Sequence, residues 1–180
     1  RINLMIEEMD NVDLQISISK NISEMNLMLN HYLDFIKNEK NENFDEIDTQ
    51  KFIENLTFDY SKLNLTMNAS KIIFIKKNQI SRALVNILDN ANKFAEKIYL
   101  SSYVSETKWV ITIEDNGPGT SLSQEELVKP FTKGSEQLNQ GTGLGLSIVQ
   151  KLIKLNNGEL RFEKSSHGGL KVLISLDVNY

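Results

Sequence analysis

Apolar residues follow a heptad pattern along the first forty positions, in alternating steps of four and three. The pattern runs through Ile18, Ile22, Met25, Leu29, Tyr32 and Ile36. No glycine or proline interrupts residues 12–40, so we predict one helix of about seven turns. Apolar residues at 2–9 indicate the end of a preceding helix, and Asp-Asn-Val-Asp at 10–13 suits the turn between the two helices.

The two helices form a hairpin whose apolar surface is larger than one hairpin buries by itself. We therefore expect a dimeric four-helix bundle made from two copies of the chain. The alternative is a long helix that packs on its own domain. Polar residues at 40–45 (KNENFD) mark a linker, which gives expected domains at 1–40 and 41–180.

The second domain mixes helical and strand periods. In chain order we expect a helix from Asp48 or Thr49 to about Tyr60, strands at 63–69 and 71–75 around a turn, a helix at 78–95, strands at 97–104 and 108–115, a helix at 142–155, and a hairpin of 159–164 and 169–178. Residues 116–141 form a long loop with one helical turn at 124–128, and loops of this length are usually functional. The expected fold class is α+β, an α/β sandwich with helices on one face of a mixed sheet.

Composition narrows the class of protein. Hydrophobic residues make up 40% of the 180, and the net charge of −4 argues against a broad nucleic-acid-binding surface. The absence of cysteine excludes disulfides and thiolate metal sites. No apolar run reaches the roughly 18 residues that span a bilayer, and no signal peptide is visible. Because the chain starts at Arg1, we expect it to be a piece of a longer protein.

Residues 139–147 read NQGTGLGLS, with three glycines directly before a predicted helix. A dinucleotide-binding fingerprint would need a glycine at position 146, which is leucine. A P-loop would need a lysine after its last glycine, and protein-kinase motifs are also absent. Backbone N–H groups at a helix start still favour an anion. The alternative is a tight loop between a strand and a helix.

The sequence DNGPG at 115–119 directly follows a predicted strand. Asp115 ends the apolar run, so we expect its carboxylate to point into a pocket at the end of the sheet. A carboxylate there suits an exocyclic amine such as adenine N6. Gly117 and Gly119 would let a ligand approach the backbone closely. Taken alone, the same five residues are typical of a turn.

The predicted helix at 78–95 carries Asn86 and Asn90 on one face, and Lys93 lies near that face. Amide oxygens suit Mg²⁺ beside a phosphate, and lysine supplies a positive charge for the phosphate. Both asparagines lie next to the inward apolar stripe, where a buried amide needs a partner. The alternative is that they are simply exposed.

Four segments resemble the N, G1, F and G2 boxes of sensor histidine kinases in order and spacing. They are RALVNILDNANKF (82–94), DNGPG (115–119), PFTKG (130–134) and GTGLGLSIV (141–149). The helix sequence and the short lid look most similar to osmosensor-type, EnvZ-like kinases. The resemblance covers the whole chain, because 1–40 looks like the end of the family's dimerisation and phosphotransfer domain. It implies a catalytic ATP-binding domain of the GHKL type for 41–180.

The resemblance implies ATP-binding roles for the matched residues. These are Asn86, Asn90, Lys93, Phe94, Asp115, Gly117, Gly119, Phe131, Lys133, Gly141, Thr142, Gly143, Leu144 and Gly145. Asn90 would coordinate Mg²⁺, and Asn86 and Lys93 would lie beside the phosphates. Phe94 would lie near the nucleotide, and Asp115 would bind adenine N6.

The resemblance also implies an ATP lid at 120–140. Phe131 would anchor this lid, Lys133 would contact the γ-phosphate, and the glycines at 141–145 would form its hinge and a cradle of N–H groups. The implied activity is transfer of the γ-phosphoryl group from ATP to a histidine on an upstream helix of the homodimer, and then to an aspartate of a response-regulator receiver domain. The full-length protein would be anchored in the bacterial inner membrane, with this part in the cytoplasm.

The sequence departs from the family pattern at two places. The phosphoacceptor box of the His-Glu/Asp-Leu-Arg-Thr-Pro type is missing, so we expect the chain to begin just after it. His31 lacks such a motif and is expected on the surface of the bundle, while His167 is expected to be solvated in a hairpin turn. Leu170 stands where many members have threonine, so we expect no hydroxyl contact near adenine there.

An ATP-hydrolysing clamp of the gyrase, MutL or Hsp90 type is the alternative function. Those proteins have a glutamate four residues before the metal-binding asparagine, and that position is Asn86 here. An amide does not act as a general base near neutral pH, which favours phosphotransfer. A third possibility, a module that has lost ATP binding, would show damaged boxes, whereas all four are intact.

Overall fold

The structure is a computed structural model of the chain. It describes residues 14–16, 18–23, 25, 42–68, 70–133 and 142–178. The chain divides into two compact units, Arg1–Asn41 and Glu42–Tyr180. Within the described ranges, no helix combines the length and the apolar character needed to cross a membrane.

The described residues of the first unit are helical, as the heptad pattern predicts. Ile18 and Ile22 are half-buried, and Met25 is 59% exposed. The later positions of the heptad pattern, the helix expected at 2–9 and His31 lie outside the described residues. The dimeric bundle and the expected roles of the two domains therefore stay predictions.

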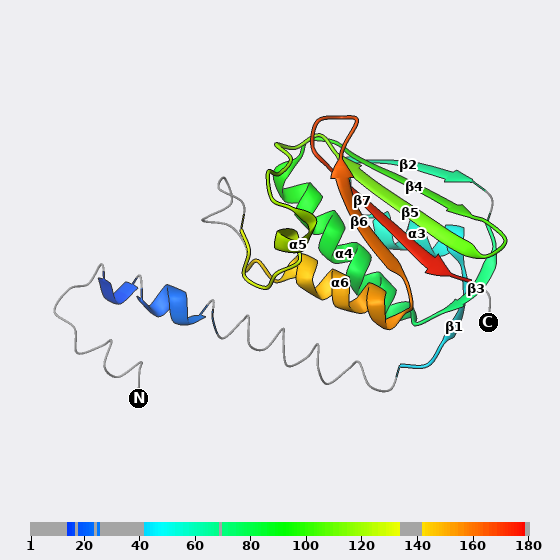
Figure 1. Cartoon of the computed structure of the whole chain (residues 1–180), viewed down its shortest axis with the longest axis horizontal. Helices are drawn as coiled ribbons and strands as arrows, with labels where there is room; N and C mark the ends of the chain where they lie inside the picture. The colour runs from blue at the N-terminus through cyan, green and yellow to red at the C-terminus, as the bar shows by residue number, and fades with distance from the viewer. Residues whose placement is uncertain are drawn as a thin grey trace. The chain divides into compact units, whose positions relative to one another are not determined.

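The second unit contains, within its described residues, two sheets and the helices that pack with them. In chain order the elements are β1 (Asp45–Asp48), α3 (Thr49–Thr57), β2 (Leu63–Asn68), β3 (Ile72–Ile75), α4 (Lys77–Phe94), β4 (Ile98–Val104), β5 (Lys108–Asp115), α5 (Gln124–Leu127), α6 (Gly145–Leu155), β6 (Glu159–Lys164) and β7 (Leu170–Asp177). The larger sheet has the strand order β2-β4-β5-β7-β6, and β1 and β3 form the smaller one (Figure 1).

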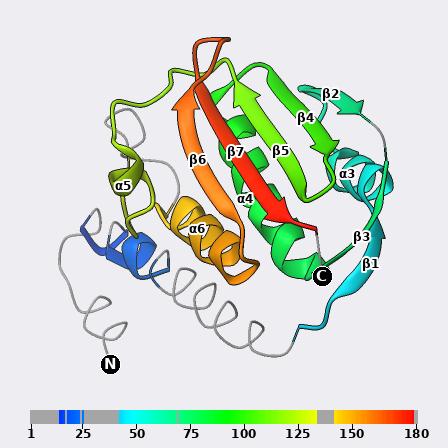
Figure 2. The same ribbon diagram turned by 45° about the vertical axis from the view of Figure 1, so that its right-hand side comes forward.

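The larger sheet is mixed, as predicted. β2 runs parallel to β4, and the other neighbouring strands are antiparallel. Helices α3, α4 and α6 lie on one face of this sheet (Figure 2). The arrangement is the α/β sandwich that the sequence predicts.

The centre of the core lies on β5, where apolar residues alternate as expected for a strand covered on one face. Trp109 and Ile111 are fully buried and Ile113 is 2% exposed. The Trp109 indole N–H donates to the Ser102 hydroxyl at 2.8 Å, so this buried donor has a partner. The Trp109 ring also meets Phe52 of α3 edge-on, with 5.9 Å between centroids.

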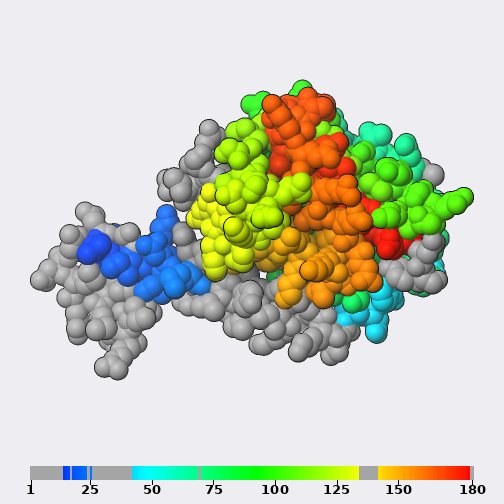
Figure 3. Space-filling model, in the orientation of Figure 1, coloured from blue at the N-terminus to red at the C-terminus, as the bar shows by residue number. Residues whose placement is uncertain are grey.

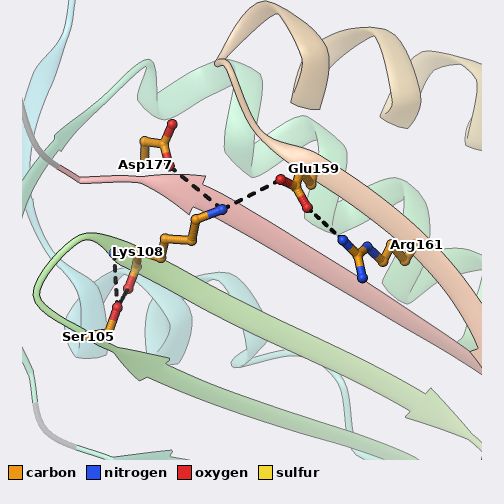
Figure 4. A network of polar contacts seen from close by, with 5 residues as sticks. All are labelled: Ser105, Lys108, Glu159, Arg161 and Asp177. Carbon is orange, nitrogen blue, oxygen red and sulfur yellow. Dashed lines mark hydrogen bonds and ion pairs between the residues drawn. The ribbon is translucent and has the colours of Figure 1, made fainter.

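The opposite face of the sheet carries charged side chains. Lys108 forms ion pairs with Glu159 at 3.5 Å and Asp177 at 3.9 Å, and Arg161 pairs with Glu159 at 3.0 Å (Figure 4). The positive charge of Lys108, assisted by Arg161, lowers the pKa of Glu159. Because these side chains are largely solvated, their ion pairs contribute little to the stability of the fold.

The smaller sheet was not predicted. The strands expected at 63–69 and 71–75 form as β2 and β3, but they belong to different sheets, because β3 pairs with β1. The predicted linker ends at Asp45, and the sequence predicts no strand after it. The reason is that β1 has acidic residues around a single apolar position, so it shows no apolar alternation. That position, Ile47, is buried, and β3 supplies the partner strand that sequence periodicity does not reveal.

Two helices also differ at their ends. Asp48 caps α3 by accepting the N–H of Lys51 at 3.0 Å, as predicted, but the helix ends at Thr57 rather than near Tyr60. The helix expected from position 142 begins at Gly145. Gly143 has a φ of +71°, which lies outside the helical region, so the first expected turn does not form.

The start of α4 is capped by a residue from far upstream. The Glu42 carboxylate accepts the backbone N–H groups of Asn78 at 2.6 Å and Gln79 at 3.2 Å. The adjacent N-cap residue, Lys76, provides no side-chain cap; its ammonium group lies 5.6 Å from the centre of the Phe44 ring. Glu42, the first residue of the second unit, therefore satisfies two of the free N–H donors of this helix.

The other end of α4 is capped by Lys62. Its ammonium group donates to the carbonyl oxygens of Asn92 and Ala95, both at 2.9 Å. A positive charge at this end opposes the partial negative charge of the helix C-terminus. Both ends of α4 are thus held by residues outside the helix.

Candidate functional site

The polar face of α4 lies beside the start of α6. Asn86 donates its side-chain N–H to the Arg82 carbonyl at 3.0 Å, one turn earlier. A Cβ at Gly145, the first residue of α6, would lie 3.8 Å from Asn86 Oδ1. The amide oxygen of Asn86 therefore faces the N-terminus of α6, where free N–H groups favour an anion.

Asn90 lies one turn further along α4 and is half-buried. Within the part of the chain that the structure describes, its side chain makes no hydrogen bond, so its amide is available to a ligand. Phe94 is half-buried, and Lys93 is exposed near the end of the same helix. This face can offer an amide oxygen and a positive charge to a phosphorylated ligand.

Asp115 ends β5 and is half-buried. Its Oδ1 accepts the backbone N–H groups of Gly117 at 2.8 Å and Leu170 at 3.2 Å. Burial raises the pKa of the Asp115 carboxyl, and the two hydrogen bonds partly oppose that rise. Among the described residues Oδ2 has no hydrogen-bond partner, so one carboxylate oxygen is positioned by the backbone and the other can accept from an amine.

Gly169 is a site residue that the sequence analysis missed. Its N–H donates to the Asp115 carbonyl at 3.2 Å, and a Cβ at this position would overlap the Asp115 carboxylate. The sequence signal is the Gly-Gly pair at 168–169, of which Gly168 is predicted in the hairpin turn and Gly169 at the start of the following strand, without a role in the site. Glycine is needed here because the turn backbone lies directly against the carboxylate.

The neighbouring Glu114 holds the same turn from the outer face of the sheet. Its carboxylate accepts the hydroxyls of Ser165 and Ser166, each at 3.2 Å, and the Ser166 N–H at 3.1 Å. His167 is exposed in this turn, as predicted, and its ring stacks on Tyr99 with 3.8 Å between centroids. The consecutive carboxylates of Glu114 and Asp115 therefore both hold this turn, Glu114 at Ser165 and Ser166 and Asp115 at Leu170.

Phe131 of the predicted lid lies against Gly143, which belongs to the glycine segment after the lid. The Phe131 N–H donates to the Gly143 carbonyl at 2.9 Å, and the Phe131 side chain is 66% exposed. Phe131 therefore contacts the glycine segment through its backbone rather than through its ring. Thr142 Oγ1 accepts the N–H of Leu144 at 3.3 Å, and Leu144 is buried at 7% exposure. Lys133 is half-buried.

A pocket of about 580 Å³ lies between the lid segment and the edge of the sheet. It is lined by residues 118–122, Gln124, Leu127, 162–164 and 168–170. Figure 3 shows the lid segment, in yellow-green, beside strand β6, in orange. Gln124 of α5 accepts the Phe162 N–H at 3.5 Å, which partly covers the edge strand. Of the predicted site residues, this pocket includes Gly119 alone, so it adjoins the predicted nucleotide site without containing it.

The described members of the predicted site form three groups. One lies along α4, with Asn86 facing the start of α6 (Asn86, Asn90, Lys93, Phe94), a second lies at and after the end of β5 (Asp115, Gly117, Gly119), and a third lies in the predicted lid and at the start of α6 (Phe131, Lys133, Thr142, Gly143, Leu144, Gly145). Gly141 lies outside the described residues. Within those residues no cluster of three His, Cys, Asp or Glu side chains could hold a metal. A Mg²⁺ ion here would fit the amide of Asn90 only if phosphate oxygens and water completed its shell, which is a usual arrangement for this ion.

Comparison with known proteins identifies the second unit. Residues 75–180 match the family described as histidine kinase-, DNA gyrase B-, and HSP90-like ATPase. The chain is 26% identical to the sensor histidine kinase GtrS of Pseudomonas aeruginosa over 181 residues, covering 98% of this chain and 38% of GtrS. It is 36% identical to the sensor histidine kinase CpxA of Escherichia coli K12 over 104 residues, covering 55% of this chain and 23% of CpxA.

The solved structures agree with the fold. The histidine kinase domain of the E. coli osmosensor EnvZ matches with a TM-score of 0.61 and 27% identity, over 79% of this chain and 93% of that domain. The chain spans well under half the length of the curated relatives named above.

Proposed function

The chain belongs to the family of histidine kinase-, DNA gyrase B-, and HSP90-like ATPases, and we propose that it is part of the kinase core of a sensor histidine kinase. In this proposal the chain binds ATP and Mg²⁺ and catalyses the transfer of the γ-phosphoryl group from ATP to a histidine on a helical bundle. The observation that carries the proposal is the combination of two features: the Asn86 amide oxygen of α4, which faces the start of α6, and a backbone-held carboxylate at the end of β5.

The adenine would bind at Asp115. Its Oδ1 is already occupied by backbone N–H groups, so the free Oδ2 accepts from the exocyclic amine. The triphosphate would extend toward Asn86 and the N-terminus of α6, with Lys93 nearby as a positive charge. Mg²⁺, when bound, would neutralise charge on the phosphate oxygens, and Asn90 would hold it.

Asn86 favours phosphotransfer over hydrolysis. Water must lose a proton to become an effective nucleophile, and the Asn86 amide cannot take that proton. A neutral imidazole attacks phosphorus through the lone pair of its unprotonated nitrogen, so this chain needs to supply no base. The P–O bond to ADP breaks as the P–N bond forms, and the residues named above contribute positioning and charge neutralisation. An ATP-hydrolysing clamp is therefore the less favoured function.

The finer parts of the proposal concern partners and location. The heptad pattern of the first unit would form a homodimeric four-helix bundle with a second copy. The phosphoryl group would pass from the histidine to an aspartate of a response-regulator receiver domain. The full-length protein would be anchored in the bacterial inner membrane, with these residues in the cytoplasm.

A transfer assay tests the proposal. The 180-residue chain is mixed with a separate histidine-bearing helical bundle from a sensor kinase and with γ-labelled ATP. We expect acid-labile label on the bundle, lost with Asn90→Ala. The matched control is Asn92→Ala on the exposed face of the same helix, which should transfer label normally. Phosphate release without transfer would favour the clamp, and absence of nucleotide binding would exclude both functions.

A further inference from the structure

Asn116 joins the end of β5 to the segment that leaves α4. Its side-chain Oδ1 accepts the backbone N–H groups of Glu96 at 3.0 Å and Lys97 at 2.8 Å. Its own backbone N–H donates to the Lys97 carbonyl at 3.2 Å. One residue therefore satisfies two of the three backbone amides in the short connection between α4 and β4.

The next residue brings the two segments into backbone contact. A Cβ at Gly117 would lie 2.9 Å from the carbonyl oxygen of Phe94, the last residue of α4. The missing side chain lets the loop after β5 rest directly on the C-terminus of the helix. Asn116 and Gly117 together form a joint between these elements, which we call the α4–β5 joint.

The two sides of the α4–β5 joint are each held independently of Asn116. The Asp115 carboxylate is fixed by Gly117 and Leu170, and the end of α4 is capped by Lys62. Asp115 pairs with Ile98 at the start of β4, and Asn116 adds the hydrogen bonds that hold the connection between that strand and α4. Asp115 directly precedes it, and Asn90 lies about one helical turn before the end of α4.

We infer that Asn116 is a positioning residue for nucleotide binding, which fixes the separation of Asp115 and Asn90 so that one ATP molecule reaches both. This inference rests on the proposed function, because it assigns the adenine to Asp115 and the phosphates to α4. A ligand that spans two preorganised groups loses affinity when their separation is no longer fixed. A ligand that touches only one of the two groups keeps its affinity when their separation changes.

The role requires an acceptor at position 116 and nothing more. Both side-chain hydrogen bonds go to Oδ1, and within the described residues Nδ2 has no partner. Aspartate keeps the acceptor in the same place, whereas alanine removes it. Asn64 provides a control of the opposite hydrogen-bond direction. Its side-chain amide donates to the Ile98 carbonyl at 3.4 Å from the neighbouring strand β2, so Asn64→Ala leaves both hydrogen bonds to Asn116 Oδ1 in place.

The experiment measures the dissociation constants of ATP with Mg²⁺ and of adenosine for wild type, Asn116→Ala, Asn116→Asp and Asn64→Ala. We expect Asn116→Ala to weaken ATP about tenfold while adenosine changes less than about twofold. Asn116→Asp should bind ATP within about threefold of wild type, and Asn64→Ala should match wild type for both ligands. Hydrogen exchange at the amides of Glu96 and Lys97 should accelerate only in Asn116→Ala. If that variant fails to fold, Asn116→Ser, whose shorter side chain cannot reach both amides, takes its place.

Three results would overturn the inference: unchanged ATP affinity in Asn116→Ala, equal weakening of ATP and adenosine, or an Asn116→Asp variant as weak as alanine. Equal weakening would mean that Asn116 supports Asp115 alone. Failure of the proposed function is distinct, because the wild-type chain would then bind no ATP or would release phosphate without labelling the helical bundle.

Discussion

Gly143 lies directly against Phe131, so the glycine segment before α6 contacts the predicted lid. The Phe131 N–H donates to the Gly143 carbonyl at 2.9 Å. A Cβ at Gly143 would lie 2.8 Å from the Phe131 carbonyl carbon and 2.8 Å from the Thr132 carbonyl oxygen. The glycine therefore serves two needs at once, a φ of +71° and space for another backbone.

Gly143→Ala should push Gly143 away from Phe131 and Thr132 and weaken ATP binding. We expect the dissociation constant of ATP to rise about tenfold, because both the strained φ and the backbone clash must be relieved. Calorimetric titration measures the affinity, and circular dichroism should show an intact fold. Normal ATP affinity in this variant would contradict the role given to the contact.

Gly145→Ala is the matching glycine substitution in the helix. The position has no positive φ, and its Cβ would meet only Asn86 Oδ1 at 3.8 Å. Replacing a helical glycine by alanine should raise the free energy of unfolding by about 0.5–1 kcal/mol. Thermal unfolding of the two variants should therefore shift in opposite directions.

Asp115→Asn should weaken ATP strongly while leaving the fold intact. The amide oxygen can still accept from Gly117 and Leu170, but a charged acceptor for the adenine amine is lost. We expect a loss of affinity of about 10- to 100-fold. Affinity measurements with ATP and with GTP provide the check, since a site that does not read the exocyclic amine through Asp115 would lose neither affinity nor selectivity.

The stability of wild type relative to Asp115→Asn should depend on pH in a defined direction. Burial raises the pKa of Asp115 above its ordinary value of 3.8. A carboxyl with a raised folded-state pKa contributes stability below 3.8 and loses that contribution as pH rises through the folded value. Wild type should therefore lose stability relative to Asp115→Asn as pH increases through this window, and the gap should then level off. Melting temperatures over an acid-to-neutral series measure it; a gap independent of pH would contradict the raised pKa.

Ser102→Ala should destabilise the core through Trp109. The indole N–H would lose its acceptor at 2.8 Å and stay buried without one. We expect a decrease of about 1–3 kcal/mol in the free energy of unfolding. Urea titration followed by the fluorescence of Trp109, the only tryptophan of the chain, gives the value. Ser101→Ala on the exposed face of the same strand should have little effect.

Lys108→Met should raise the pKa of Glu159 toward its ordinary value, because Lys108 is the main cause of its lowering. Arg161 would keep part of the effect. A carboxyl titration by NMR measures the change. Lys171→Met is the control, since Lys171 pairs with Glu163 at 3.3 Å and should leave Glu159 unchanged.

The sequence predicts the elements whose cause is local. Trp109, Ile111 and Ile113 alternate on β5 because one face of the strand is buried, and that alternation is visible in the chain itself. The cap at Asp48 is visible for the same reason, because its partner lies three residues away. Helix α4 was predicted to within one residue at each end.

The features that were missed depend on residues far apart in sequence. Ile47 needed a partner on β3, and Gly169 matters only because the turn lies against Asp115. Asn116 was quoted in its motif, but its bonds reach back about twenty residues to the end of α4. The chemistry of the site is therefore readable from the motif residues, whereas the geometry that supports them comes from the tertiary fold.

The cap on α4 has a consequence for the proposed nucleotide site. Glu42 is the first residue of the second unit, and it holds two N–H groups at the start of the helix that carries Asn86 and Asn90. Releasing this cap would remove the acceptor of two N–H groups in the first turn of α4. The residue at which the second unit begins therefore stabilises the helix that carries the proposed phosphate-binding amides.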